Sequence, residues 1–230
     1  MTDFFRFPHT GHLTWLGQDM PRDDKLLAPG EVDALFADEV VVEEKLDGAN
    51  IGISLDDAGE LRVQNRGQYL QAPYKGQFSR LNAWLAQHQY ALHEFLDSDT
   101  ILFGEWCAAV HSIEYSILPD WFLLFDLYDR PSGRFASQSR RNQLATEVGL
   151  TVVPELLRGI FELRELLDQL EVRQSQYSDA LAEGFVVRCD AGDWCQARGK
   201  IVRADFTQSI ETHWSQNRLR WNRVALPSSA

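Results

Sequence analysis

The chain has 230 residues, of which 44% are hydrophobic and 11% aromatic. This composition supplies a buried core and excludes disordered, collagen-like and coiled-coil proteins. The 22 basic and 34 acidic residues give a formal net charge of −12, which argues against a protein that binds nucleic acid through an overall positive charge. Any polyanionic partner must therefore be bound by a local group of basic residues.

The three cysteines, Cys107, Cys189 and Cys195, are an odd number without the spacing of metal ligands, so we expect free thiols in a reducing compartment. The first residues contain no basic segment followed by an apolar run. No apolar stretch reaches the roughly 18 residues that a membrane span requires. We therefore expect a cytoplasmic protein with no membrane partner.

The first predicted elements are β-strands. Residues 40–44 form a β-branched run, and residues 51–55 alternate in polarity. Residues 56–59 have the composition of a turn, and residues 61–63 resume the strand pattern. This order predicts a strand followed by an antiparallel hairpin.

Helices and further strands follow along the chain. Apolar residues recur at helical spacing within 74–96, where we expect an amphipathic helix with one break. Two more helices are predicted near 137–148 and 162–170. Further strands are predicted at 100–106, 121–127, 184–188, 194–197 and 200–203. The pattern favours an α+β fold of antiparallel β-sheets with flanking helices, in a single domain over residues 1–230 that ends in a short tail after about residue 204.

The most distinctive local sequence is Glu44-Lys45-Leu46-Asp47-Gly48, in which a lysine ends an apolar strand. Burial and nearby cations lower the pKa of a lysine, and a partly desolvated Lys45 amine is then able to attack phosphorus. The alternative is a surface salt bridge on a hairpin. The sequence lacks the common phosphate-binding loops and zinc motifs.

Four more clusters follow in a fixed order: Phe103-Gly104-Glu105-Trp106, Leu123-Leu124-Phe125-Asp126, Glu183-Gly184-Phe185-Val186 and Lys200-Ile201-Val202-Arg203. With these clusters the sequence resembles, from Val40 to Arg203, the covalent nucleotidyltransferases, the superfamily of ATP-dependent RNA and DNA ligases and mRNA capping enzymes. Within the superfamily, Asn65-Arg66-Gly67 and His111-Ser112-Ile113 with Tyr115 are most similar to ATP-dependent RNA ligases of the RNA ligase 2 type. The resemblance implies the ligase adenylation-domain fold, here without an appended OB or other C-terminal domain.

The resemblance also implies a three-step sealing reaction. Lys45 attacks the α-phosphorus of ATP and retains AMP, the AMP passes to an RNA 5′-phosphate, and an RNA 3′-hydroxyl then displaces it. The expected cofactors are ATP and Mg²⁺ or Mn²⁺. The expected partners are RNA 5′-phosphate and 3′-hydroxyl ends, nicked duplexes among them, in RNA repair. We expect a monomer.

Site residues are assigned by the same resemblance. The catalytic set is Lys45, Asp47, Glu183 and Lys200, in which Glu183 binds the metal ion and Lys200 neutralises the α-phosphate. The nucleotide-binding set is Glu44, Asn50, Arg66, Glu105, Phe125, Lys200 and Arg203. In this set Glu105 accepts a hydrogen bond from the ribose and Phe125 stacks on adenine. For each residue the alternative is a structural role, such as an ion pair at a strand end or packing in the core.

One position departs from the family pattern. RNA ligases of this type usually carry a second lysine two residues after the terminal one, whereas position 202 is valine and the nearest cation is Arg203. Either Arg203 substitutes for that lysine, or the first step depends more on Lys200 and the metal ion.

The C-terminal region is the most basic part of the sequence. Seven basic and four acidic residues lie between Arg188 and Arg223, and Arg218, Arg220 and Arg223 are interleaved with Trp214 and Trp221. This mixture suits RNA phosphates and stacked bases. A solvated terminal helix with tryptophans packed on the core is an equal alternative.

Two other functions stay open. A DNA ligase or a capping-type nucleotidyltransferase would use the same covalent step. A non-catalytic nucleotide-binding or nucleic-acid-binding module would keep the fold without turnover. Val202 favours the non-catalytic module, whereas the intact set Lys45, Glu105, Glu183 and Lys200 argues against it.

Overall fold

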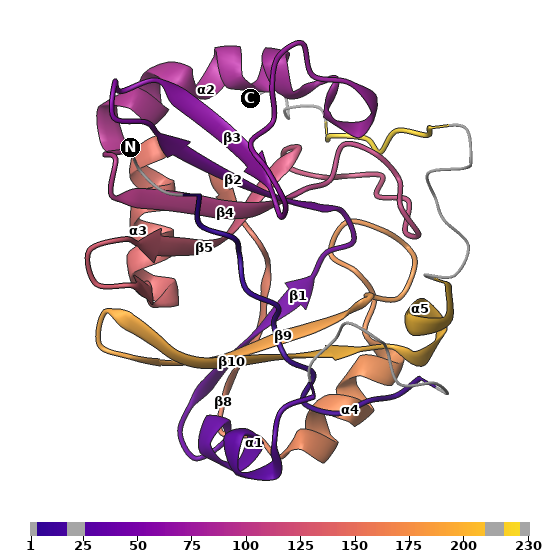
Figure 1. Ribbon diagram of the computed structural model, residues 1–230. Coiled ribbons are helices and arrows are strands. Elements are labelled where there is room, and N and C mark those ends of the chain that lie inside the picture. Colours follow the sequence, from indigo (N-terminus) through magenta and orange to yellow (C-terminus); the bar gives the residue numbers. More distant parts are fainter. Residues whose placement is uncertain (1–3, 18–25, 210–218, 226–230) are drawn as a thin grey trace, which may run out of the picture.

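Two β-sheets face each other across the centre of the molecule, with helices on their outer sides (Figure 1). The computed structural model describes residues 4–17, 26–209 and 219–225. Within these residues the strands pair almost entirely in antiparallel fashion. The predicted α+β class with antiparallel sheets is confirmed.

The first sheet has four strands in the order β10-β9-β1-β8. They are β1 (Val40–Lys45), β8 (Glu155–Gly159), β9 (Gly184–Ala191) and β10 (Trp194–Val202). β1 lies in the middle and pairs with β8 on one side and β9 on the other. In this register Lys45 is opposite Gly184, so the last residue of β1 lies beside the first residue of β9.

The second sheet has the strand order β3-β2-β4-β5-β6, and β7 pairs with β5 in parallel. Its strands are β2 (Ala49–Leu55), β3 (Leu61–Asn65), β4 (Thr100–Trp106), β5 (Phe122–Asp129), β6 (Arg134–Phe135) and β7 (Thr151–Val152). The chain passes from the first sheet to the second between β1 and β2, within residues 46–48. This crossing places the segment that follows Lys45 between the two sheets.

Helices pack on the outer face of each sheet because their apolar sides complete the core there. α2 (Leu81–Phe95) and α3 (Gln138–Val148) contribute Trp84, Leu92 and Val148 to the core of the second sheet. α1 (Pro29–Leu35) and α4 (Leu163–Val172) contribute Leu35, Leu166 and Leu170 to the core of the first sheet. A short helix, α5 (Ala204–Ser209), follows β10.

Most predicted elements are confirmed. The expected hairpin is β2 and β3, joined by a turn in which Asp56 Oδ1 accepts hydrogen bonds from the backbone of Ala58 and Glu60. The broken helix within 74–96 is a 3₁₀ turn, η1 (Gly76–Phe78), followed by α2. The helices predicted near 137–148 and 162–170 are α3, which begins after an N-cap at Ser137, and α4.

The prediction of two strands at 194–197 and 200–203 is wrong. One continuous strand, β10, covers this region, with an irregularity between Cys195 and Ala197. Gly199 lies inside the strand and does not break it. A Cβ atom at this position would come within 2.4 Å of the Leu13 side chain. The glycine leaves room for the N-terminal segment, whose Leu13 N–H donates to the Lys200 carbonyl.

Five short elements were not predicted: α1, β6, β7, β8 and α5. Residues 219–225, expected to belong to a tail, pack against the loop at 107–118 through β-bridges. The cysteines are free, as expected. In the part of the chain that the structure describes, no helix has both the length and the apolar character to cross a membrane.

Candidate nucleotide-binding site

A cavity of about 720 Å³ opens between the two sheets, which is within the range of small-molecule sites. Both sheets and the N-terminal segment contribute to its wall, including β1, β2, β5, β9 and β10. Its lining includes Phe7, Glu43, Glu44, Lys45, Asn50, Arg66, Glu105, Phe125, Asp126, Arg188, Arg198 and Lys200.

Lys45 lies at one side of this cavity, where β1 ends. Because Lys45 pairs with Gly184, the neighbouring Glu183 comes close, and Lys45 Nζ donates a hydrogen bond to Glu183 Oε1 at 2.6 Å. Burial lowers the pKa of Lys45, but the charges of Glu183, Glu105 and Asp47 outweigh it, and the pKa is raised. The prediction that the surroundings lower the Lys45 pKa is wrong, because carboxylates and not cations surround the amine.

Two carboxyl groups near Lys45 have pKa values far above their ordinary range. Burial raises the pKa of Glu105 to about 8, and the charge of Lys45 opposes this shift. Burial likewise raises the pKa of Glu183 to about 7, again against the charge of Lys45. Glu183 Oε2 is buried and has no hydrogen-bond partner among the described residues. Such shifts are typical of sites that bind charged ligands or transfer protons.

Asp47 lies beside this group but not on the cavity wall. Its Oδ2 accepts hydrogen bonds from the backbone N–H groups of Ser112 and Ile113, at 2.6 and 2.9 Å. Its own backbone N–H donates to the Tyr115 hydroxyl at 2.8 Å. Asp47 is therefore fixed by the loop that follows β4, and its charge acts on the Lys45 amine.

Three predicted nucleotide-binding residues line the cavity with polar atoms that have no partner. Asn50 Oδ1, Arg66 Nε and Glu44 Oε1 are buried and make no hydrogen bond within the described residues. The other oxygen of Glu44, Oε2, accepts a hydrogen bond from the Gln176 backbone at 2.9 Å, and burial raises its pKa. Buried polar groups in folded proteins normally have partners, so these atoms favour a polar ligand in the cavity.

Phe125 and Lys200 lie on opposite sheets. Phe125, on β5, is partly buried and meets the Phe7 ring edge-on at 5.3 Å between centroids. Its carbonyl oxygen accepts hydrogen bonds from Arg141 and Arg188. Lys200, on β10, donates its backbone N–H to the Gly11 carbonyl. Both residues line the cavity, as the resemblance requires of a base-stacking ring and a phosphate-binding cation.

Arg203 does not lie on the cavity wall. Its guanidinium donates to the carbonyl oxygens of Leu170 and Glu171 at the end of α4 and pairs with Asp205. These contacts hold the Arg203 side chain away from the cavity wall in this structure, and its contact with the nucleotide stays a prediction. The Asp205 contact depends on the short α5 helix, because its first turn places Asp205 at 3.2 Å from Arg203 Nε.

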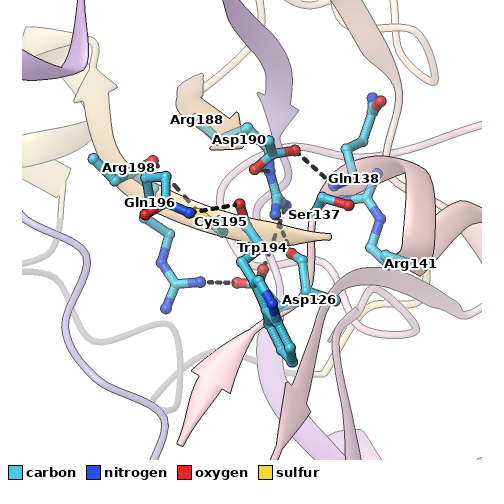
Figure 2. Close-up of polar contacts among 12 residues, drawn as sticks. Asp126, Ser137, Gln138, Arg141, Arg188, Asp190, Trp194, Cys195, Gln196 and Arg198 are labelled. Atoms are coloured by element: carbon cyan, nitrogen blue, oxygen red, sulfur yellow. Dashed lines mark hydrogen bonds and ion pairs between the residues drawn. The ribbon is translucent and has the colours of Figure 1, made fainter. Parts of the chain in front are cut away.

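A buried ionic network in the cavity wall was not predicted. Arg188 lies 3.3 Å from Asp126 and 3.2 Å from Asp190, and Arg198 also pairs with Asp126 (Figure 2). Arg141, on α3, pairs with Glu43 at 2.7 Å. The network connects β1, β9 and β10 of the first sheet with β5 of the second. A sequence indication existed for three of these charges, because Glu43, Asp126 and Arg188 each interrupt or end an apolar run in a strand.

The C-terminal arginines and tryptophans fall partly outside the described residues, which exclude Trp214 and Arg218. Trp221 packs against the core of the second sheet, where Arg80 lies over its ring at 4.4 Å. Arg220 and Arg223 are exposed. Tryptophan packing on the core is therefore confirmed for Trp221, although its segment is extended and not helical.

Comparisons with known proteins agree with this architecture. The sequence model of the RNA ligase family matches residues 38–202. No curated protein matches the chain. A mutant RNA ligase from Naegleria gruberi, solved with ATP and Mn, superposes with a TM-score of 0.59 at 19% identity, over 80% of this chain and 55% of that one.

A second similar structure is an archaeal ATP-dependent RNA ligase, with a TM-score of 0.61 at 23% identity, over 86% of this chain and 48% of that one. Another Naegleria gruberi RNA ligase mutant, solved with AMP and Mn, superposes with a TM-score of 0.58 at 15% identity, over 91% of this chain and 64% of that one. The chain thus spans about half to two thirds of the length of these structures, with which it shares its fold.

Proposed function

The chain belongs to the RNA ligase family, and on that premise we propose that it is an ATP-dependent RNA ligase that adenylylates Lys45. The observation that supports this most directly is the pairing of Lys45 with Glu183 at the side of a cavity whose wall carries unpartnered polar atoms on Glu44, Asn50 and Arg66. ATP offers the donors, acceptors and anionic oxygens that these atoms lack.

In the first step Lys45 Nζ attacks the α-phosphorus of ATP. A P–N bond forms, the P–O bond to the β-phosphate breaks, and pyrophosphate leaves with that electron pair. The ammonium group loses one proton before the attack and the amine loses a second as the P–N bond forms. Glu183 Oε1, at 2.6 Å from Nζ, stabilises the ammonium form, so this pairing must weaken before the attack.

The remaining cavity residues would orient the nucleotide. Phe125 would stack on adenine, Glu105 would accept a hydrogen bond from the ribose, and Lys200 would neutralise the α-phosphate. Asn50 and Arg66 would contact phosphate oxygens, and Glu44 would contact the base. Asp47 would act on the Lys45 amine through its charge.

Mg²⁺ or Mn²⁺ is the metal cofactor that we propose. The buried, unpartnered Glu183 Oε2 fits such an ion, because hard cations prefer carboxylate oxygens. The described residues contain no group of three metal-binding side chains, so phosphate oxygens of the nucleotide would complete the coordination. A bound divalent ion would offset charge on pyrophosphate and weaken the hold of Glu183 on the Lys45 proton. The relatives solved with ATP and Mn support this choice.

The later steps would use RNA ends. The AMP would pass to an RNA 5′-phosphate, and an RNA 3′-hydroxyl would attack that activated end and release AMP, as in RNA repair. We propose that a monomer acts in the cytoplasm on broken strands or nicked duplexes. RNA would be distinguished from DNA by contacts to the 2′-hydroxyl.

The test is a label-transfer assay with α-labelled ATP and Mg²⁺, followed by sealing of nicked RNA and DNA duplexes. We expect the wild type to gain one covalently bound AMP, and Lys45→Ala to gain none. Lys75→Ala, which removes an exposed lysine, is the matched control and is expected to label normally. Preferential sealing of RNA would support the proposal, whereas equal or better sealing of DNA would favour a DNA ligase.

A preparation free of bound AMP that takes up no label would overturn the proposal. In that case the non-catalytic binding module would account for the cavity. If Lys45→Ala were still labelled, the nucleophile would be another residue.

A further inference from the structure

Residues 219–225, here called the C-terminal strap, lie beyond the family match at 38–202 and run along the loop at 107–118. Five backbone hydrogen bonds of 2.8 to 3.0 Å connect the two segments. In chain order of the strap they involve Arg220 with Val110, Asn222 with Ala108, Arg223 with both Tyr115 and Leu118, and Ala225 with Leu118. The strap therefore supports the loop along most of its length.

Asn222 is the buried centre of this contact, with 2% of its surface exposed. Its side-chain Nδ2 donates to the carbonyl oxygens of Cys107 and Ala109, at 2.8 and 3.1 Å. Its Oδ1 accepts the backbone N–H of Tyr115 at 2.8 Å. Both donors and the acceptor of the amide are used, so the side chain sets the distance between the start of the loop and Tyr115.

The loop in turn fixes Asp47. Ser112 and Ile113 donate to the Asp47 carboxylate, and the Tyr115 hydroxyl accepts the Asp47 backbone N–H. Asp47 is two residues from Lys45 and lies within the crossing into the second sheet. A continuous path of hydrogen bonds thus leads from Asn222 through the loop to the segment that carries the nucleophile.

We propose that Asn222 is a positioning residue for lysine adenylylation, which acts on Lys45 through Tyr115 and Asp47. The inference rests on the proposed function. Asn222 does not line the cavity, so its loss should slow the chemical step and leave ATP binding nearly unchanged. A residue that serves only stability would lower the folded fraction and leave the rate per folded molecule unchanged.

The experiment measures single-turnover formation of lysyl-AMP at several ATP concentrations. The folded fraction of each variant is measured separately, so that each rate is expressed per folded molecule. Asn222→Leu is made in the wild type and in the Asp47→Asn variant. We expect Asn222→Leu to lower the maximal rate by about tenfold or more, with the half-saturating ATP concentration within about threefold of the wild type. In the Asp47→Asn background the same substitution should lower the rate by less than about twofold.

Leu92→Ala provides the control for general destabilisation, because Leu92 is buried in α2 away from the cavity. Its rate per folded molecule should equal that of the wild type. An equal loss from Asn222→Leu in both backgrounds would overturn the proposal. So would a wild-type rate in the Asn222 variant, or a loss confined to ATP binding.

Two milder variants decide the matter if Asn222→Leu does not fold. Asn222→Asp keeps the acceptor for Tyr115 and removes the two donated hydrogen bonds. Tyr115→Phe removes the hydroxyl that accepts the Asp47 N–H. Both should lower the maximal rate without a matching change in ATP binding, and normal rates in both would overturn the proposal.

Failure of this inference can be distinguished from failure of the proposed function. A wild type that takes up no label would overturn the proposed function itself. A labelled wild type together with normal rates in the variants would overturn this inference and leave the proposed function standing.

Discussion

The backbone N–H of Arg203 donates to the carbonyl oxygen of Glu183 at 3.0 Å, while the Arg203 guanidinium lies against the end of α4. Main chain and side chain of Arg203 thus serve different parts of the fold. The main chain secures the residue proposed to bind metal, and the side chain satisfies the last carbonyl groups of a helix. Lys200, three residues earlier, lies on the cavity wall.

This difference predicts opposite outcomes for two alanine variants. Arg203→Ala should keep the adenylylation rate within about threefold and reduce the free energy of unfolding by about 0.5–1 kcal/mol, because it loses contacts at a helix terminus. Lys200→Ala should lower the rate by about a hundredfold, because it loses a fixed charge on the phosphate. Single-turnover labelling and urea denaturation measure both. A large rate loss in Arg203→Ala would mean that its guanidinium reaches the nucleotide.

The raised pKa of Glu105 predicts a pH-dependent stability. Burial moves this pKa from an ordinary 4.5 to about 8, so between these values the folded protein binds a proton that the unfolded chain has released. The free energy of unfolding therefore falls as the pH rises through this window. Glu105→Gln removes this pH dependence. Between pH 5 and pH 9 the free energy of unfolding of the variant should therefore rise by about 1–3 kcal/mol relative to that of the wild type.

Urea denaturation at several pH values tests this prediction. Lys45 does not obscure it, because its raised pKa affects stability only above pH 10.5, the ordinary value of the group. Glu60→Gln, at an exposed position, is the control for the loss of a carboxylate elsewhere on the surface. A constant difference between Glu105→Gln and the wild type would contradict the assigned pKa.

Gly184 predicts a steric effect on the site. A Cβ atom at this position would lie 2.1 Å from the Ile201 carbonyl oxygen, so Gly184→Ala must move β10 away from β9. We expect a loss of about 1–3 kcal/mol in the free energy of unfolding and slower adenylylation, because Lys45 and Lys200 lie on the neighbouring strands.

Gly30→Ala is the matched control, because no heavy atom lies within 4 Å of a Cβ at that position. It should leave activity unchanged and raise stability by about 0.4–1 kcal/mol. Thermal denaturation and labelling of both variants give the comparison. Equal stability of the two alanine variants would show that β10 adapts without cost.

The ionic network in the cavity wall predicts a large loss of stability from the substitution of one arginine. Arg188 is 2% exposed and contacts Asp126, Glu43 and Asp190, so Arg188→Met removes a buried positive charge that three carboxylates share. The expected loss is about 3–5 kcal/mol in the free energy of unfolding. Arg158→Met removes an exposed ion-paired arginine and should cost less than about 1 kcal/mol. Similar losses in the two variants would contradict the role assigned to the network.

Local sequence patterns predicted the strands and the cavity residues for a physical reason. The β-branched run of β1 and the alternation of β2 specify extended backbone whatever the strands pair with. Lys45, Glu105, Phe125 and Lys200 could be placed together because each lies at a strand position that the family order specifies. The structure brings all four to one cavity.

Local sequence patterns could not predict which strands pair or which residues support the site from a distance. β1 and β2 are consecutive in sequence but belong to different sheets, and nothing in either strand specifies that crossing. The contact of Asn222 with the loop at 107–118 depends on tertiary structure, since an asparagine between Trp221 and Arg223 has no distinctive local pattern. The pKa of Lys45 was misjudged because its direction depends on Glu105 and Glu183, which are remote in sequence.

The ion pair of Lys45 and Glu183 joins residues that are 138 positions apart, and β10 of the same sheet contributes Lys200 to the cavity wall. Contacts of such long range form slowly, because much of the chain must be ordered before they can be made. During synthesis, a nascent chain that ends before β10 has its nucleophile but neither the completed sheet nor Lys200. The proposed nucleotide site is therefore complete only after β10 has been synthesised.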